Sequence, residues 1–226
     1  MPVPAAAPDL PADWRARLRR RLLDVPEHRL EYCRAAGLAR ESAAVRAQLR
    51  ASWPASLKLA AVLVPIIDRE PLPALLMTVR ASHLRRHAGQ ISFPGGRLEA
   101  HDADLAAAAM RETEEEIGIA AAAIAPIGFL PDHVVQTGYR ITPVVALVRP
   151  GLTLRPDGTE VAEVFELPLT VALSLDNYHV SRRTIRDVEV DTWELSFGRY
   201  NIWGATAGML ANLREVFDQE TLEEAP

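Results

Sequence analysis

Cysteine is almost absent from this sequence. Cys33 is the only one among 226 residues, so an intrachain disulfide is impossible. A zinc site built on thiolates is not expected either, because such sites draw on several cysteines. We interpret Cys33 as a small apolar side chain in the core. Lysine is equally scarce, with Lys58 alone, so arginine carries the positive charge. Arginine suits phosphate recognition, because its planar group binds two oxygens at once.

Long apolar runs are missing too. No window of about 18 apolar residues exists, so no segment is expected to cross a membrane. The first residues, MPVPAAAPDLPADWRARLRRR, have no apolar run before the arginines, unlike a secretory signal. A formal net charge of −5 gives no broad attraction to nucleic acids or anionic membranes. We therefore expect a soluble, cytoplasmic protein that binds neither of them, and the oligomeric state, monomer or homodimer, stays open.

Pro54 separates two kinds of sequence. Residues 11–50 have apolar side chains at helical spacing, whereas the segment after Pro54 is apolar and β-branched. We therefore predict a helical N-terminal extension at residues 1–53 and a main domain at residues 54–226. The arginines of the extension favour a solvated helix face over a nucleic-acid arm. The residues that carry the helical spacing are Trp14, Leu18 and Leu22.

The main domain mixes strands with helices. One helix is predicted over residues 105–117, ending at Gly118, and another over residues 203–217. A long polar loop is expected at residues 81–94. Because strands and helices do not alternate regularly, an α+β fold with a mixed sheet is favoured. Strands are predicted at residues 57–67 and 74–80 (a hairpin), 124–130, 139–148 and 160–169, with a late hairpin at residues 179–197.

The helix that ends at Gly118 concentrates negative charge. Its last turns hold Glu112, Glu114, Glu115 and Glu116, and like charges at helical spacing destabilise a helix. At about 100° per residue, Glu114 points away while the other three share a face. Three adjacent carboxylates indicate a bound cation, and oxygen ligands without clustered His or Cys indicate Mg²⁺ or Mn²⁺. The carbonyl of Gly95 is a candidate further ligand, because glycine allows close backbone approach.

The stretch GGRLEAHDADLAAAAMRETEEEIGI resembles the Nudix box, G-x5-E-x7-R-E-U-x-E-E-x-G-U with U apolar. Thr113 stands at an apolar position, and one extra residue separates the glycine from the arginine. Counted from the glycine, the first Glu of the box falls on Asp102; counted from the arginine, it falls on Ala103. We assign this accessory acid to Asp102, with Glu99 or Asp104 as alternatives. The matching residues are Gly96, Arg111, Glu112, Glu115, Glu116, Gly118 and Ile119.

This resemblance implies a Nudix fold, in which a mixed sheet lies between helices in an α/β/α sandwich. It also implies hydrolysis of a nucleoside diphosphate linked to another group, with one to three divalent ions held by the carboxylates. Arg111 would orient or neutralise a neighbouring carboxylate. A glutamate would take the proton of the attacking water. Candidates for this base are Glu115, Glu116 and, outside the box, Glu163.

Just upstream, LMTVRASHLRRHAGQISFPGG at residues 76–96 resembles the motif of the coenzyme A diphosphatase branch, LLTxR-[SA]-x3-R-x3-G-x3-FPGG. Met77 replaces the second leucine, a change that conserves volume. Ten fixed positions match, namely Leu76, Thr78, Arg80, Ala81, Arg85, Gly89, Phe93, Pro94, Gly95 and Gly96.

This second resemblance implies coenzyme A as substrate, which carries a diphosphate and a separate 3′-phosphate. Arg80 and Arg85 would each bind phosphate oxygens, with Arg86 and His87 assisting. Phe93 is assigned to the same substrate-binding segment, where it fixes the strand and loop that enter the metal site. The residue types alone favour a core position for Trp203 over stacking on a ligand.

Three functions compete at this stage. A metal-dependent coenzyme A diphosphatase would release 4′-phosphopantetheine and adenosine 3′,5′-bisphosphate. A Nudix pyrophosphatase for ADP-ribose or dinucleotides would use the same chemistry, but residues 76–96 argue against it. A Nudix-fold binding module without catalysis is disfavoured by the intact glutamates, although the extra residue before Arg111 leaves room for it.

Overall fold

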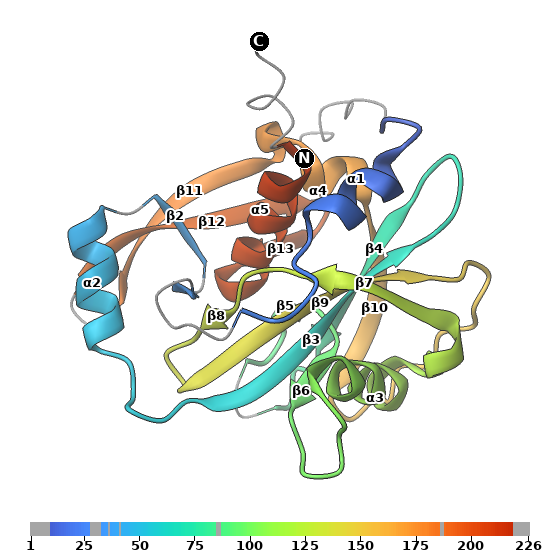
Figure 1. The fold of residues 1–226 in the computed structure, drawn as a ribbon, viewed down its shortest axis with the longest axis horizontal. Helices are drawn as coiled ribbons and strands as arrows, with labels where there is room; N and C mark the ends of the chain where they lie inside the picture. Colours follow the sequence, from blue (N-terminus) through green and yellow to red (C-terminus); the bar gives the residue numbers. More distant parts are fainter. Residues whose placement is uncertain are drawn as a thin grey trace.

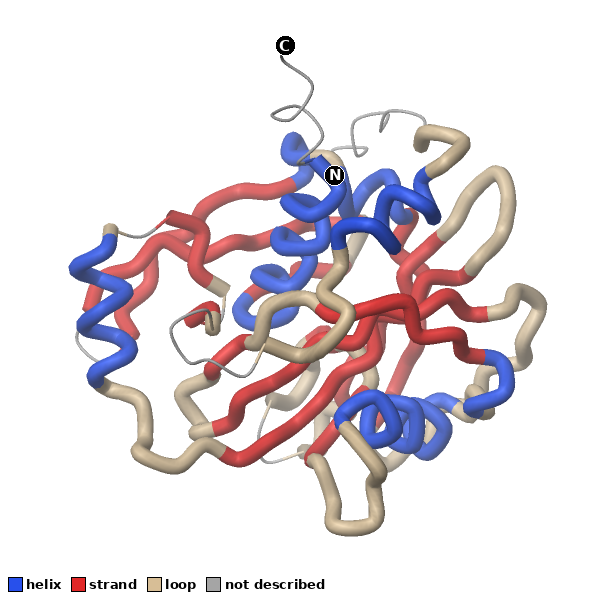
Figure 2. The backbone as a smooth tube through the Cα atoms, viewed as in Figure 1, coloured by secondary structure: helices blue, strands red, loops and turns tan. Residues whose placement is uncertain are grey.

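The computed structural model describes residues 10–27, 33–35, 37–40, 42–84, 87–185 and 188–218. A large sheet runs through the middle of the molecule, with helix α3 on one side and several helices and a smaller sheet on the other (Figures 1 and 2). None of the helices in this part of the chain is long and apolar enough to cross a membrane.

The large sheet has nine strands, and its main path runs β1-β8-β9-β3-β4-β10. Strands β3 and β9 pair in parallel along their whole length, whereas β3–β4 and β4–β10 are antiparallel. The predicted mixed sheet is therefore confirmed. Its strands are β1 (Arg34–Ala35), β3 (Lys58–Ile67), β4 (Ala74–Arg80), β5 (Ile91–Ser92), β6 (Gly95–Arg97), β7 (Ile124–Phe129), β8 (His133–Val134), β9 (Tyr139–Val148) and β10 (Val161–Pro168).

The predicted hairpin of β3 and β4 forms, but its strands pair only near the turn, at Ile66↔Leu75 and Ile67↔Ala74. Farther from the turn, β6 pairs with β3 and β5 pairs with β4. The predicted loop at residues 81–94 therefore returns into the sheet at its end. This return brings Gly95 and Gly96 into the sheet, opposite Val62 and Ala61 of β3.

Helix α3 (Leu105–Ile117) has the predicted bounds. The side chain of Asp104 accepts a hydrogen bond from the backbone N–H of Ala107 at 2.8 Å, which caps the first turn. Gly118 ends the helix in the left-handed conformation, with φ of 75°. The apolar face packs on the large sheet, so the glutamates of the last turns are held at one fixed place. The buried residues of that face include Leu105, Ala108, Ala109 and Ile117.

The opposite face of the large sheet packs on three helices and the smaller sheet. The small sheet contains the predicted late hairpin, β11 with β12, in antiparallel pairing. The core on this side includes Met77, Phe165, Leu195 and Leu210. The elements are α1 (Trp14–Arg21), α4 (Leu169–Leu173), α5 (Gly204–Asp218), β2 (Leu38–Arg40), β11 (Tyr178–Ile185), β12 (Val188–Phe197) and β13 (Tyr200–Trp203).

The N-terminal region is helical only in part, which corrects the prediction for residues 11–50. It contains α1 and α2 (Ala43–Ala51), but also β1 and β2, and these strands join the large and the small sheet respectively. Trp14 and Leu18 are 2% and 0% exposed within the core of the main domain. The described part of this region is therefore built into the same body, rather than appended to it.

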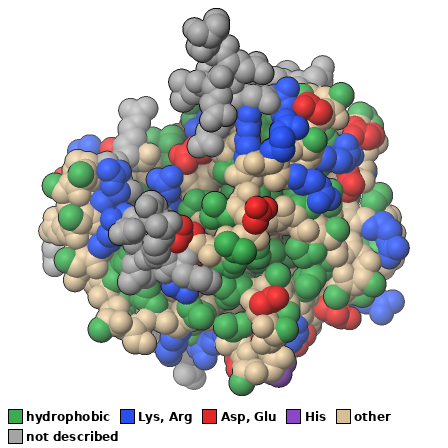
Figure 3. Space-filling view, in the orientation of Figure 1, with side chains coloured by type: hydrophobic (Ala, Val, Ile, Leu, Met, Phe, Trp, Pro, Cys, Tyr) green, Lys and Arg blue, Asp and Glu red, His purple; other side chains and the backbone are tan. Residues whose placement is uncertain are grey.

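On the face shown in Figure 3, basic side chains lie on several sides and acidic side chains lie among them. Charges of both signs are therefore mixed over the described residues of this face.

Candidate metal-binding and active site

Helix α3 meets strand β6 at two glycines, and both are needed there. The backbone N–H of Gly95 donates to Oε2 of Glu116 at 3.2 Å. A Cβ on Gly96 would lie 2.3 Å from the carboxylate of Glu112, and one on Gly95 would lie 2.3 Å from the carbonyl oxygen of Ala61. Only glycine lets the strand pass this close, so the pair places two carboxylates directly against the backbone.

Arg111 is the centre of a hydrogen-bond network on α3. Its Nε and Nη2 atoms donate to the two oxygens of Asp102 at 2.9 and 3.0 Å, a bidentate arrangement. Its Nη1 atom donates to Glu112 at 3.0 Å and to Glu115 at 3.1 Å. Nη2 also donates to the backbone carbonyl of Arg97, 3.2 Å away. One guanidinium group therefore holds three acids of the box region in place.

Three acids were considered for the accessory acid of the box, and of these Asp102 is the one that hydrogen-bonds to Arg111. The side chain of Asp102 is 3% exposed and also accepts from the backbone N–H of Glu99 at 2.8 Å. The hydrogen bonds from Arg111 are the main reason that its pKa falls to about 2. Asp104 is used as the cap of α3, so capping does not explain Asp102.

Glu116 is a buried acid, with 7% of its surface exposed. Its pKa is raised to about 7, mainly by burial; the charges of Glu112 and Glu160 contribute to the rise, and the Gly95 N–H and the charge of Arg80 oppose it. Burial also raises the pKa of Glu112. Both groups therefore carry their negative charge at a free-energy cost, which a nearby cation would remove.

The donor set fits a hard divalent cation, because every acidic ligand in it is an oxygen. In the arrangement seen over the described residues, however, no three acidic, histidine or cysteine side chains converge on one point. The side chain of Glu115 is 60% exposed and lies 3.1 Å from Nη1 of Arg111. Glu114 is exposed, as its position on the helix predicts.

Arg80 of the upstream motif lies beside these acids. Its Nη2 atom is 3.4 Å from Oε2 of Glu160, and its charge lowers the pKa of Glu116. Its Nε atom is buried and has no hydrogen-bond partner among the described residues. A guanidinium group next to a carboxylate cluster is suited to binding a phosphate oxygen.

The other substrate-binding predictions have different outcomes. Phe93 of the substrate-binding segment is 3% exposed and belongs to the core, a position from which it can fix the strand and loop without touching substrate. His87 is exposed in a turn, with φ of 59°, and its Nδ1 atom is 2.7 Å from Oε1 of Gln90. Arg85 and Arg86 lie outside the described residues.

Glu163 is engaged away from the box. It accepts a hydrogen bond from the hydroxyl of Tyr200 at 2.6 Å and pairs with Arg199. It shares a face of β10 with Phe165, whose ring stacks on Tyr200 at 3.6 Å between centroids. That is the face toward the small sheet, so Glu163 is not brought to the glutamates of α3.

Glu160 is the acid that sequence reasoning missed. Its backbone carbonyl accepts from the N–H of Ala81 at 2.8 Å, which fixes it beside Arg80. Its charge raises the pKa of both Glu112 and Glu116. The segment EVAEVFELPL holds Glu160 and Glu163 alike, and only the pairing of β10 with β4 shows which one faces the site.

The prediction of a core position for Trp203 is wrong. The side chain is 36% exposed, and the guanidinium group of Arg183 lies over its ring at 4.7 Å. Strand residues alternate between faces, and the neighbouring Ile202 takes the core position with 0% exposure.

The domain combines a mixed sheet with a glycine pair and with helix glutamates that share one arginine as a hydrogen-bond donor. Comparison with known proteins identifies its family. The model of the NUDIX domain matches residues 57–188. The chain is 46% identical to the uncharacterized Nudix hydrolase NudL of Escherichia coli O1:K1 / APEC over 154 residues, or 68% of this chain and 80% of the relative. NudL of Shigella boydii serotype 18 matches with the same identity and coverage.

Among solved structures, the Nudix hydrolase RenU of M. smegmatis matches with a TM-score of 0.50 and 19% identity, over 76% of this chain and 91% of that one. That likeness concerns the fold. Together with the matched domain and the identity to NudL, it shows that the chain belongs to the Nudix hydrolase family.

Proposed function

We propose that this Nudix hydrolase cleaves the diphosphate of coenzyme A, giving 4′-phosphopantetheine and adenosine 3′,5′-bisphosphate. The observation that carries the proposal is the position of Arg80. It belongs to the motif at residues 76–96, whose resemblance is to the coenzyme A diphosphatase branch, and it lies against Glu160 and within the electrostatic reach of Glu116. The substrate motif and the Nudix box thus meet in one site.

Nudix hydrolases generally use divalent metal ions, and we propose Mg²⁺ or Mn²⁺, held by Glu112, Glu115 and Glu116 with the carbonyl of Gly95. Such an ion supplies charge neutralisation at the diphosphate and lowers the pKa of bound water. Arg111 keeps Glu112 in place through its hydrogen bond at 3.0 Å and donates another to Glu115 at 3.1 Å, which would have to break for Glu115 to serve as a metal ligand.

The roles of the remaining residues follow from their positions. Arg80 binds an oxygen of the diphosphate through its guanidinium group, since the side chain is 26% exposed. Asp102 holds Arg111 from the far side and so fixes the network. The proton of the attacking water goes to a carboxylate. We propose Glu160 for this role beside Glu115 and Glu116, because its side chain is 56% exposed and not buried against the backbone.

The test is an assay with coenzyme A, ADP-ribose and NADH at equal concentration, in the presence of Mg²⁺ or Mn²⁺. We expect kcat/KM to be highest for coenzyme A. A preference for ADP-ribose or NADH would instead support the alternative function, a Nudix pyrophosphatase for ADP-ribose or dinucleotides. Binding of coenzyme A without turnover of any of the three would identify a non-catalytic binding module.

Arg80 gives a sharper test of the same site. Because it lies at the glutamates, we expect Arg80→Ala to lower kcat/KM by the same factor for coenzyme A and for 3′-dephospho-coenzyme A, roughly 30-fold or about 2 kcal/mol. A penalty that shrinks for the dephosphorylated substrate would place Arg80 at the 3′-phosphate instead. Coenzyme A turnover in cells would agree with the expected cytoplasmic location.

A further inference from the structure

An aspartate in the segment between β9 and β10 joins two parts of the Nudix site through its hydrogen bonds. This residue is Asp157, which stands three positions before Glu160 in the sequence PDGTE. Its backbone N–H reaches the end of α3, and its carboxylate reaches the backbone of Glu160. Asp157 therefore contacts both the helix that carries Glu116 and the turn that carries Glu160.

The backbone of this segment holds the end of α3. The N–H of Asp157 donates to the carbonyl of Glu116 at 3.0 Å, and the next bond runs from the N–H of Arg155 to the carbonyl of Ile117 at 2.9 Å. The last carbonyls of a helix have no partner within the helix, so these two bonds satisfy groups that need an outside donor. A Cβ on Gly118 would lie 3.1 Å from the Cβ of Arg155, so the segment packs closely against the helix end.

The carboxylate of Asp157 accepts hydrogen bonds from the chain that follows it. Oδ1 accepts from the backbone N–H of Val161 at 2.8 Å, and both oxygens accept from the backbone N–H of Glu160 at 3.1 Å. The hydroxyl of Thr159 donates to Oδ2. Burial acts to raise the pKa of Asp157, but these hydrogen bonds outweigh it and lower the pKa, so the carboxylate is charged at neutral pH.

This turn determines where Glu160 stands. Its N–H is bound by Asp157, and its carbonyl accepts from the N–H of Ala81 at 2.8 Å, so its backbone is fixed on both sides. Its side chain is 56% exposed, with Oε2 at 3.4 Å from Nη2 of Arg80. Because packing does little to hold a side chain this exposed, its placement depends chiefly on the backbone that carries it.

We propose that Asp157 is a positioning residue for hydrolysis, which holds Glu160 in a fixed place relative to Glu116. This role rests on the proposed function, in which Glu160 takes the proton of the attacking water. A general base must lie within hydrogen-bond reach of that water, and a displacement of about 1 Å can cost about 10²-fold in rate. The oxygens of Asp157 accept from its own turn, so it acts through Glu160 and not on the substrate.

The experiment is a double-mutant cycle of Asp157→Ala and Glu160→Gln, measured with whichever of coenzyme A, ADP-ribose and NADH the full-length wild type hydrolyses. Asp157→Ala should lower kcat roughly tenfold or more and leave KM within about twofold, because it displaces the base and keeps the substrate contacts. In the Glu160→Gln background the same change should lower kcat less than about twofold, since the displaced side chain no longer acts.

Two further variants separate positioning from general damage. Asp157→Asn keeps Oδ1 as the acceptor for both backbone N–H groups, so kcat should stay within about threefold of the wild type. Asp104→Ala is the matched control, because it also removes an aspartate that accepts a backbone N–H, at the opposite end of α3. Its kcat should stay near the wild-type value. If Asp157→Ala does not fold, Asp157→Ser, with its shorter acceptor, replaces it in the cycle.

The outcomes that contradict this role differ from those that contradict the substrate. An unchanged kcat in Asp157→Ala, an equal loss in the Glu160→Gln background, or a loss in Asp157→Asn as large as in Asp157→Ala would overturn the proposal. An unchanged kcat in Glu160→Gln alone would overturn it together with the proposed role of Glu160. Preference for ADP-ribose or NADH would contradict only the proposed substrate, whereas a wild type that hydrolyses none of the three would overturn both proposals.

Discussion

At the scale of single residues, the site is a balance between Arg111 and the acids around it. Arg111 donates hydrogen bonds to Asp102, Glu112 and Glu115, whereas Glu116 accepts one from the backbone N–H of Gly95. Glu116 is a buried acid whose raised pKa the charge of Arg80 opposes only in part, so a nearby cation would favour its charged form.

Neutralising the metal-site acids should stop catalysis without unfolding the protein. Glu115→Gln and Glu116→Gln keep shape and helix propensity but remove charge from the proposed metal site. We expect kcat to fall roughly 10²-fold or more, about 3 kcal/mol of barrier. Glu114→Gln is the control, because Glu114 is exposed and should leave kcat near the wild-type value. Near-normal turnover in folded Glu116→Gln would show that Glu116 is not part of the metal site.

The raised pKa of Glu116 also predicts how stability depends on pH in the metal-free protein. With a pKa of 4.5 when unfolded and about 7 when folded, the folded state binds more protons between these values. Its free energy of unfolding should therefore fall as pH rises from about 4.5 to about 7, by up to about 3 kcal/mol from this group.

Glu116→Gln isolates that contribution. In EDTA at pH 8 the variant should melt at a higher temperature than the wild type, whereas at pH 4 the two should melt together. Identical differences in Tm at both pH values would mean that Glu116 is not a strained acid.

Asp102 offers a test of the network itself. Asp102→Asn removes the charge that faces Arg111 and one of its acceptors, so Arg111 becomes free to pull Glu112 and Glu115 away from an ion. We expect kcat/KM to fall roughly tenfold or more. An Mg²⁺ titration should show that more metal is required for half-maximal activity. Unchanged kinetics would restrict Asp102 to holding the loop at Glu99.

At the scale of elements, α3 is the part that the sequence determines most completely. Its apolar spacing and Gly118 are local signals from which its bounds were predicted, and the structure adds a local cap, Asp104. Strands β5 and β6 and the N-terminal strands β1 and β2 are two or three residues long and pair with distant partners. Such strands have no periodicity of their own, so no sequence pattern could locate them.

The sequence also could not show that Glu160, rather than Glu163, faces the site. A bulge lies between Val161 and Glu163 where β10 pairs with β4, and it changes which side chains face α3. The prediction for Trp203 failed for a related reason. Aromatic residues suit both cores and ligand sites, and only the orientation of the strand shows which side chain faces the core.

The cap of α3 can be tested separately from the chemistry. Asp104→Ala removes the hydrogen bond to the N–H of Ala107 and should lower the free energy of unfolding by about 1 kcal/mol. Because the metal-site acids lie two turns away, kcat should stay within about twofold of the wild type at a temperature where the variant is folded. A large loss of activity with an unchanged denaturation midpoint would assign Asp104, not Asp102, to the site.

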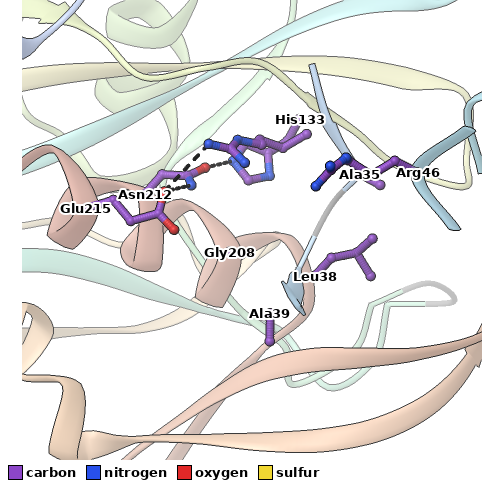
Figure 4. Close-up of a pocket in the computed structure, with 9 residues that line it drawn as sticks. Ala35, Leu38, Ala39, Arg46, His133, Gly208, Asn212 and Glu215 are labelled. Atoms are coloured by element: carbon purple, nitrogen blue, oxygen red, sulfur yellow. Dashed lines mark hydrogen bonds and ion pairs between the residues drawn. The ribbon is translucent and has the colours of Figure 1, made fainter. Parts of the chain in front are cut away.

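At the scale of the whole molecule, the region before Pro54 takes part in the main fold. Trp14, Leu18 and Leu22 enter the core shared with α5 and the large sheet, and β1 and β2 extend both sheets. This region also supplies Arg34 and Arg46, which line a small cavity beside α5 (Figure 4). Its role is therefore structural first, and the Nudix site on the far side of the sheet depends on it only indirectly.

Trp14→Ala should destabilise the entire protein and not only its N-terminal helix. The side chain is 2% exposed, and large-to-small substitutions of this kind cost about 3–5 kcal/mol. Circular dichroism of the sheet and fluorescence of the remaining tryptophans should report one shared transition at a lower denaturant concentration. Early loss of helix with an unmoved sheet transition would show an independent N-terminal unit.

The central claim is that the acids of α3 and Arg80 form one diphosphatase site for coenzyme A. The most direct measurement is product identification by mass spectrometry after incubation of coenzyme A with the protein and Mg²⁺ or Mn²⁺ in H₂¹⁸O. We predict 4′-phosphopantetheine and adenosine 3′,5′-bisphosphate in equal amounts, with one ¹⁸O in one of the two, and neither product with EDTA or with Glu116→Gln. Intact coenzyme A, under conditions in which the same preparation cleaves ADP-ribose or NADH, would contradict the claim.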